Sequence, residues 1–144
     1  DDRMQSVWLD SGYSDMGKIV VEELEFQGLP SFLGPAGIFA GKISAGQNLV
    51  EYYPLEAASE IGDRHMYVVH GKQDKRVQFH HGEEMCEVAM ENGLEGNVDC
   101  WFEDSVIRYD VGEGMANDEH VTLMLTHTDD YETRLVDFFT RSLM

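Results

Sequence analysis

The sequence has 144 residues, of which 42% are hydrophobic and 10% aromatic, as expected for a globular domain rather than a disordered chain. Its 28 acidic residues outnumber 10 basic ones and give a formal net charge of −18, which argues against binding to nucleic acid or anionic membranes. No apolar run is long enough for a membrane span and no signal-peptide pattern opens the chain, so we expect one cytoplasmic domain over residues 1–144.

The acidity has two explanations, general solubility or adaptation to high salt, where counterions screen the repulsion between carboxylates. Only four of the ten basic residues are lysines, which agrees with the second explanation.

Cys86 and Cys100 are the only cysteines and form no C-x-x-C pair. The sequence therefore predicts two small buried thiols in a reducing compartment rather than a metal site.

In the first half of the chain, the sequence predicts a strand and a helix, followed by an interrupted apolar segment. Residues 5–9 form a predicted strand that ends in a turn, and Ser14 or Asp15 caps the next helix. Residues 28–50 are a lid-like segment, in which 32–43 is apolar but broken by glycines and a proline. We expect packed helical turns over a pocket there, with a membrane-touching lid as the alternative. The apolar face of the first helix comprises Ile19, Val20, Leu24 and Phe26.

The second half alternates strands and helices. A short helix is predicted at 54–58, strands at 65–70 and 98–102, a helix at 79–92, and an added edge strand at 105–111. Thr128 or Asp129 would cap a final helix at 131–143. This order predicts an α/β fold with a mostly parallel sheet of three or four strands and flanking helices. The buried stripe predicted for the last helix comprises Leu135, Phe138, Phe139 and Leu143.

A candidate catalytic aspartate follows the predicted central strand. The segment MYVVHGKQDKRV ends its apolar run at His70-Gly71 and places Asp74 three residues later. Open α/β sheets carry their chemistry in loops at the carboxyl ends of strands. His120 comes after the next strand and is the candidate base, with Asp74 orienting its imidazole.

Three stretches of the sequence resemble serine α/β-hydrolases of the bacterial peptidase- or esterase-like kind. These are SVWLDSGYSDM, PLEAASEIGDRHMYVVHGKQDKRV and HVTLMLTHTDDYETRLVDFFTRSL, in the order in which that family carries them. The resemblance implies the carboxyl-terminal half of an α/β-hydrolase fold, with Asp74 as acid and His120 as base. It also implies a small ester or peptide-like substrate and no cofactor.

Other histidines and acidic residues offer alternatives. His127 is a rival base that could instead cap the last helix, and His70 ends the strand beside the expected site. The pair His80-His81 starts a helix, and the histidines lack the spacing of a zinc site. The acidic loop at 103–119 could bind calcium, but it lacks the D-x-D-x-D-G pattern, which favours solvated charge.

The sequence lacks the G-x-S-x-G elbow on which such hydrolases carry their nucleophile. Ser11, Ser44 and Ser59 have no such glycine frame. We therefore expect the nucleophile in an upstream segment or another chain. One alternative is a catalytically inactive remnant that acts as a binding or oligomerisation module, for example by forming a homo-oligomer. Another is a complete small ligand-binding domain, but the sequence has no phosphate-binding glycine loop to support it.

Overall fold

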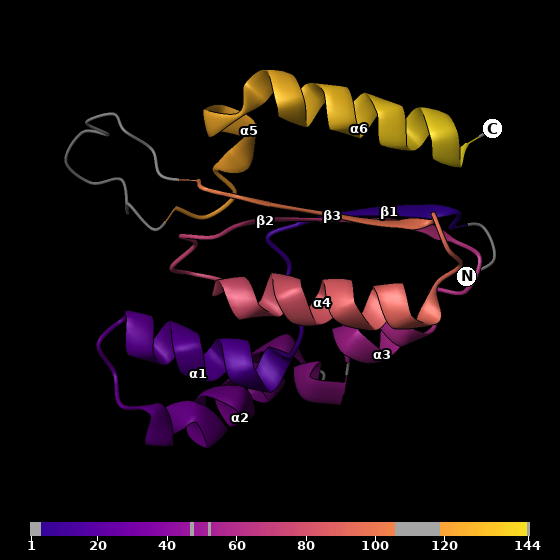
Figure 1. Cartoon of the computed structure of the whole chain (residues 1–144). Coiled ribbons are helices and arrows are strands. Elements are labelled where there is room, and N and C mark those ends of the chain that lie inside the picture. Colours follow the sequence, from indigo (N-terminus) through magenta and orange to yellow (C-terminus); the bar gives the residue numbers. More distant parts are fainter. Residues whose placement is uncertain (1–3, 47, 52, 106–118, 144) are drawn as a thin grey trace.

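The computed structural model describes residues 4–46, 48–51, 53–105 and 119–143. Three parallel strands form its sheet in the order β1-β2-β3, with bounds Ser6–Asp10, His65–Gly71 and Val98–Glu103. Helices α5 (Leu123–Thr126) and α6 (Thr128–Ser142) cover one face, and α3 (Pro54–Ser59) and α4 (Phe79–Asn92) lie on the other (Figure 1). The predicted α/β class and parallel sheet are confirmed.

The central strand β2 is buried on both faces, which explains its unbroken apolar sequence. Met66 and Val68 point into a core shared with α3 and α4, and Tyr67 and Val69 point into a core shared with α6. Trp8 of β1 stacks on Tyr67 with ring centroids 4.5 Å apart. The two cores therefore hold the sheet between two helical layers.

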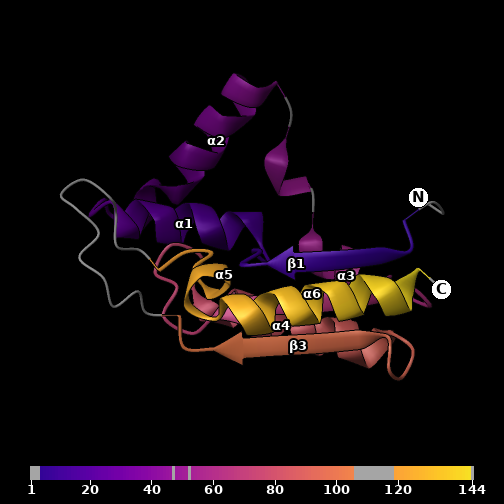
Figure 2. The ribbon, with the colours of Figure 1, turned by 90° about the horizontal axis from the view of Figure 1, so that it is seen from above.

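Helix α1 (Met16–Phe26) is capped by Asp15, one of the two predicted caps. The Asp15 carboxylate accepts hydrogen bonds from the backbone N–H groups of Gly17 and Lys18. The interrupted apolar segment forms a short 3-10 turn, η1 (Ser31–Leu33), and α2 (Gly34–Ala45). Figure 2 shows α2 projecting away from the sheet, beyond α1. The helical prediction is confirmed, but the lid role of 28–50 stays a prediction.

Helix α6 differs from its prediction at both ends. It begins at Thr128, directly after α5, and Thr128 Oγ1 donates to the carbonyl of Met124 rather than capping α6. Phe138 is buried as predicted, but Leu143 is 66% exposed. A helical stripe predicts which side of a helix faces the core, but not where the neighbouring layer ends.

A hydrogen bond links α6 to β1, because the Tyr131 hydroxyl donates to Asp10 at 2.7 Å. Burial together with this bond raises the pKa of Tyr131 to about 12.

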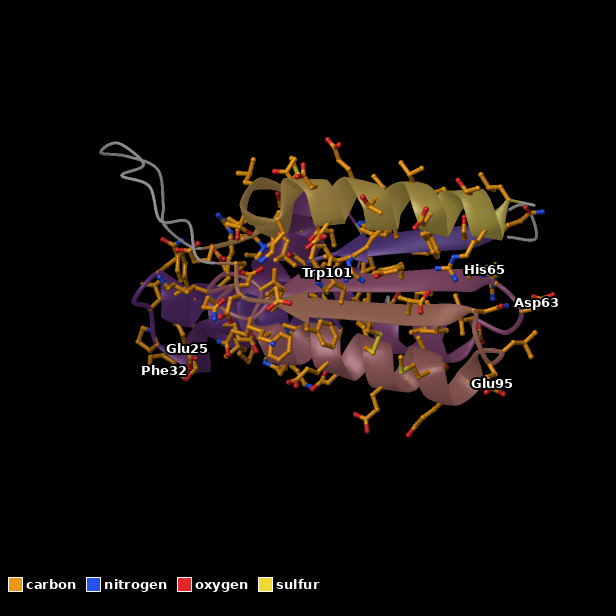
Figure 3. The ribbon with its side chains drawn as sticks, turned by 45° about the horizontal axis from the view of Figure 1, so that its top comes forward. Glu25, Phe32, Asp63, His65, Glu95 and Trp101 are labelled. Carbon is orange, nitrogen blue, oxygen red and sulfur yellow. A yellow bond between two sulfur atoms is a disulfide. The ribbon has the colours of Figure 1, made fainter. Side chains whose placement is uncertain are left out.

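The prediction of two free thiols was wrong. Cys86 of α4 and Cys100 of β3 form a disulfide, with Cα atoms 6.1 Å apart, and the linked sulfur atoms are yellow in Figure 3. The two residues face each other because α4 packs along β3. Figure 3 also places Trp101 of β3 below α6, and His65, at the start of β2, at the far end of the sheet from Glu25 and Phe32.

The predicted edge strand at 105–111 and most of the acidic loop at 103–119 lie outside the described residues. Ser105, which is described, follows β3 and belongs to no strand. Of the described helices, none is long and apolar enough to cross a membrane.

Candidate active site

Asp74 lies in the turn that follows β2, with its carboxylate fully buried. Its Oδ1 accepts hydrogen bonds from the backbone N–H groups of Arg76 and Val77, both at 2.9 Å. An aspartate holds such a turn because its short side chain reaches backbone groups two and three residues ahead. These bonds fix the carboxylate and leave Oδ2 directed at another partner.

That partner is His120, whose Nδ1 lies 2.9 Å from Asp74 Oδ2. A carboxylate oxygen can only accept, so Nδ1 carries the proton and the lone pair of the neutral imidazole is on Nε2. The His120 side chain is 31% exposed, whereas the Asp74 side chain is 0% exposed. A buried carboxylate that orients a partly exposed imidazole is the arrangement of an acid and a base in nucleophilic catalysis.

His70, at the end of β2, supports the turn that holds Asp74. Its Nε2 donates to the carbonyl of Val77 at 2.8 Å and lies 3.6 Å from Asp74 Oδ2. Burial lowers the pKa of His70, and the hydrogen bond and the Asp74 charge offset this only in part. His70 is therefore a neutral side chain that stabilises the turn beside the Asp74–His120 pair.

Both loops of the pair are anchored to the end of β3. In the Asp74 loop, Lys72 N–H donates to the carbonyl of Glu103, and Gln73 Oε1 accepts from Ser105 N–H. In the His120 loop, Thr122 Oγ1 donates to the carbonyl of Ser105 at 2.7 Å. The carboxyl end of β3 therefore holds the loops of Asp74 and His120 next to each other.

The backbone around His120 is strained. Glu119 and Val121 have φ values of 55° and 53°, in the left-handed region. A β-branched residue such as Val121 is rarely found there, and such conformations persist where the surrounding structure enforces them. The turn thus holds His120 in place through its two neighbours.

A cavity of about 430 Å³ opens beside His120, between α1 and the Asp74 loop. Its walls are mainly apolar, from the face predicted for α1, and it is large enough for a small organic molecule. Its lining residues are Ile19, Val20, Glu23, Leu24, Arg76, Val77 and His120.

The rival candidates have other contacts. His127 Nδ1 lies 2.9 Å from Thr126 Oγ1, and its ring contacts Trp101 edge to face. Ser11, directly after β1, has a left-handed φ of 51°, is buried, and its hydroxyl donates to Asp10. The structure thus pairs Asp74 with His120, while the catalytic role of both stays a prediction.

A second group of polar residues was not predicted. His81 lies between Ser14, with Oγ 2.6 Å from Nδ1, and Glu22, with Oε2 2.9 Å from Nε2. Ser14 and His81 are 1% and 0% exposed, so this group is not open to a substrate in the way a triad serine must be. The adjacent histidines were visible in the sequence, but their carboxylate partner lies on another helix.

The comparisons with known proteins support this fold. No protein-family model matches the chain, and no curated protein matches it. The chain is similar to the esterase Pf2001 of Pyrococcus furiosus in two crystal forms, each with a TM-score of 0.63 and 18% identity. The alignments cover 97% of this chain and 46% and 45% of the esterase. The chain thus has an α/β, esterase-like fold and spans about half the length of that esterase.

Proposed function

We propose that this chain contributes the acid and the base of a Ser-His-Asp triad that hydrolyses carboxylic ester or peptide-like bonds. The observation that carries the proposal is the 2.9 Å contact between His120 Nδ1 and the buried Oδ2 of Asp74. The similarity in fold to an esterase agrees with it.

In this reaction His120 Nε2 takes the proton of a serine hydroxyl as its oxygen attacks the carbonyl carbon. The proton then goes to the leaving alcohol or amine, and water releases the acyl group in a second step assisted by the same imidazole. Asp74 keeps His120 in the required tautomer and stabilises the imidazolium. The cavity beside His120 would hold part of the substrate.

We further propose that the nucleophile comes from a segment outside this sequence, either upstream or in another chain, so that the chain is the carboxyl-terminal half of the hydrolase domain. Two observations support this: the absence of G-x-S-x-G from the sequence and the match to about half of an esterase. Strand β1 is an edge of the described three-stranded sheet, and a further strand would pair there.

The test compares the 144-residue chain with a longer protein that includes an upstream G-x-S-x-G segment. Both are assayed with a p-nitrophenyl ester at low and high salt and treated with a fluorophosphonate, which labels activated serines. We expect hydrolysis and a labelled upstream serine in the longer protein, and neither in the chain alone. Labelling of a serine within residues 1–144, or an inert longer protein, would contradict the proposal.

The second candidate function is a non-catalytic module that binds a partner or a second copy. It is favoured by exposed apolar side chains on η1 and α2, where Phe32, Phe39 and Ile43 are 78%, 64% and 68% exposed. Light scattering after size exclusion separates the two candidates. A stable oligomer without ester hydrolysis in the longer protein would favour the module, whereas an active monomer would favour the hydrolase.

A further inference from the structure

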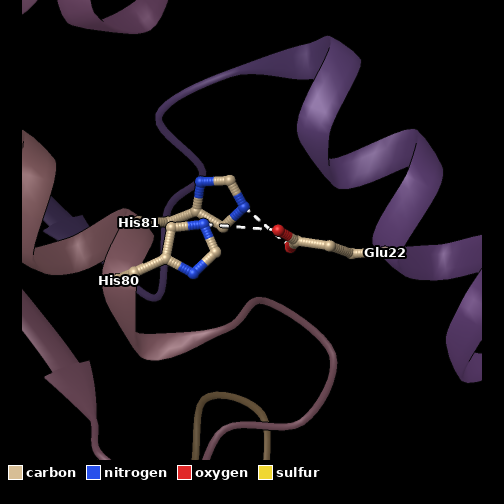
Figure 4. A group of neighbouring side chains, drawn as sticks. All are labelled: Glu22, His80 and His81. Atoms are coloured by element: carbon tan, nitrogen blue, oxygen red, sulfur yellow. Dashed lines mark hydrogen bonds and ion pairs between the residues drawn. The ribbon is translucent and has the colours of Figure 1, made fainter.

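Three potential metal ligands from two helices meet at the junction of α1 and α4. Glu22 projects from α1, and His80 and His81 project from the first turn of α4 (Figure 4). His81 Nε2 lies 2.9 Å from Glu22 Oε2, and His80 Nε2 lies 3.3 Å from Glu22 Oε1. One ligand atom of each residue lies within 4.8 Å of the others.

These distances suit a tetrahedral ion. Zn²⁺ binds imidazole nitrogen and carboxylate oxygen at about 2.0–2.2 Å, which places neighbouring ligand atoms of a tetrahedron roughly 3.3 Å apart. The two contacts of Glu22, one from each of its carboxylate oxygens, are close to that separation. Two imidazoles and one carboxylate form a ligand set found for zinc with a fourth position for water, and the nitrogen ligands disfavour Mg²⁺ and Ca²⁺.

The two histidines differ in how open they are to solvent. His80 is 37% exposed at its side chain and faces solvent, whereas His81 is fully buried. A cation can therefore approach from the His80 side and reach His81 behind it.

The buried side chain of Ser14 orients His81 through the second ring nitrogen, Nδ1. Ser14 Oγ lies 2.6 Å from His81 Nδ1 and donates to Glu84 Oε2 at 2.6 Å. With a metal on Nε2, the His81 proton moves to Nδ1 and is donated to Ser14 Oγ. Metal-bound histidines are commonly oriented in this way, by a hydrogen bond from the ring nitrogen that does not bind the metal. The backbone N–H of Ser14, now 3.1 Å from Nδ1, loses its acceptor in that state, which weakens the affinity somewhat.

We propose that Glu22, His80 and His81 bind a divalent transition metal of the zinc class, which fixes α1 against α4. The site is independent of the proposed hydrolase activity, because none of its ligands contacts Asp74 or lines the cavity among the contacts of the described residues. It has a structural consequence for that cavity, since Ile19, Val20 and Leu24 of α1 form one wall. A metal here would hold that wall in position.

The test is titration of the tag-free, EDTA-treated chain with Zn²⁺ in competition with a chromophoric chelator, alongside Mg²⁺ and Ca²⁺. We expect one equivalent of Zn²⁺ bound, with at least tenfold weaker binding in Glu22→Gln and in His80→Ala. Ser14→Ala should weaken binding about tenfold to a hundredfold by releasing the outer support of His81. Co²⁺ should give a tetrahedral visible spectrum in the wild type that both ligand variants lose.

Matched controls separate this site from general attraction of cations to an acidic protein. Glu83→Gln changes an exposed carboxylate on the same helix, and His65→Ala removes a histidine at the far end of the sheet; both should bind Zn²⁺ as the wild type does. Circular dichroism verifies that each variant is folded. No stoichiometric Zn²⁺ binding, equal binding of Mg²⁺ or Ca²⁺, or unchanged affinity in Glu22→Gln and His80→Ala would overturn the proposal.

Discussion

The molecule carries two histidine–carboxylate groups that differ in how the carboxylate is used. At the carboxyl end of the sheet, Asp74 receives two backbone N–H bonds on one oxygen and His120 on the other. At the junction of α1 and α4, Glu22 has one oxygen near each of His80 and His81. The first carboxylate is held by backbone N–H groups and orients the His120 imidazole. Among the described residues, the contacts of the second are with histidine side chains, which suits it to bind a cation together with them.

The comparison predicts that the Asp74 carboxylate is needed for chemistry rather than for folding. In the longer protein, Asp74→Asn keeps Oδ1 as an acceptor for the backbone but turns an amide toward His120, which favours the wrong tautomer. We expect kcat for ester hydrolysis to fall by about 10⁴-fold. Asp104→Asn, at an exposed carboxylate that binds Gln73, is the control and should keep kcat. Equal kcat values in the two variants would contradict the role of Asp74.

The disulfide should support global stability, and its two cysteines belong to neither histidine–carboxylate group. Reduction of Cys86–Cys100, which are 14 positions apart, should lower the free energy of unfolding by about 3 kcal/mol. Urea unfolding with and without a phosphine reductant measures this change. A Cys86→Ala/Cys100→Ala variant is the control, since the reductant should leave its unfolding curve unaltered. Identical curves for the oxidised and reduced wild type would show that the crosslink is absent.

Gly82 links the two groups, because it follows His81 in α4 and lies against His70 beside Asp74. A Cβ at Gly82 would come within 2.6 Å of His70 Nδ1. Gly82→Ala should therefore destabilise the protein by about 1–3 kcal/mol through overpacking. Gly41→Ala in α2, where a Cβ meets no atom within 4 Å, should stabilise it by up to about 1 kcal/mol. Thermal unfolding of the two variants checks the opposite signs.

The smallest effect concerns pH. Burial holds the folded-state pKa of His70 below the ordinary value of 6.5, so the unfolded chain binds this proton first as the pH falls. The contribution of neutral His70 to the free energy of unfolding is therefore complete above pH 6.5 and is lost as the pH falls below that value. Asp74, Asp10, His81 and the Phe79 ring face His70 and modulate the loss.

His70→Gln keeps an N–H donor for the Val77 carbonyl but cannot titrate. Between pH 6.5 and 5, the slope of its unfolding free energy against pH should be smaller than that of the wild type, by up to about 1.4 kcal/mol per pH unit. Urea denaturation across this range measures both slopes. Equal slopes would show that His70 is protonated as readily in the folded state as in the unfolded chain.

The pairing of Asp74 with His120 was predictable because parallel strands bring the loops at their carboxyl ends together. The group around Glu22 was not, because Glu22 and His81 are 59 positions apart and meet only through the packing of α1 on α4. The disulfide was missed for the same reason: nothing local in the sequence shows which residue of β3 lies below Cys86. Periodicity predicts elements and faces, whereas contacts between helices depend on how the layers meet.

The account is tested most directly by kcat/KM for ester hydrolysis in the longer protein carrying His120→Ala or His127→Ala. Both variants remove one partly buried histidine from neighbouring turns, so circular dichroism should first show that both remain folded. We predict a fall of at least about 10³-fold for His120→Ala and a change of only a few fold for His127→Ala. Full activity in His120→Ala, or an equal loss in His127→Ala, would contradict the assignment of His120 as the base.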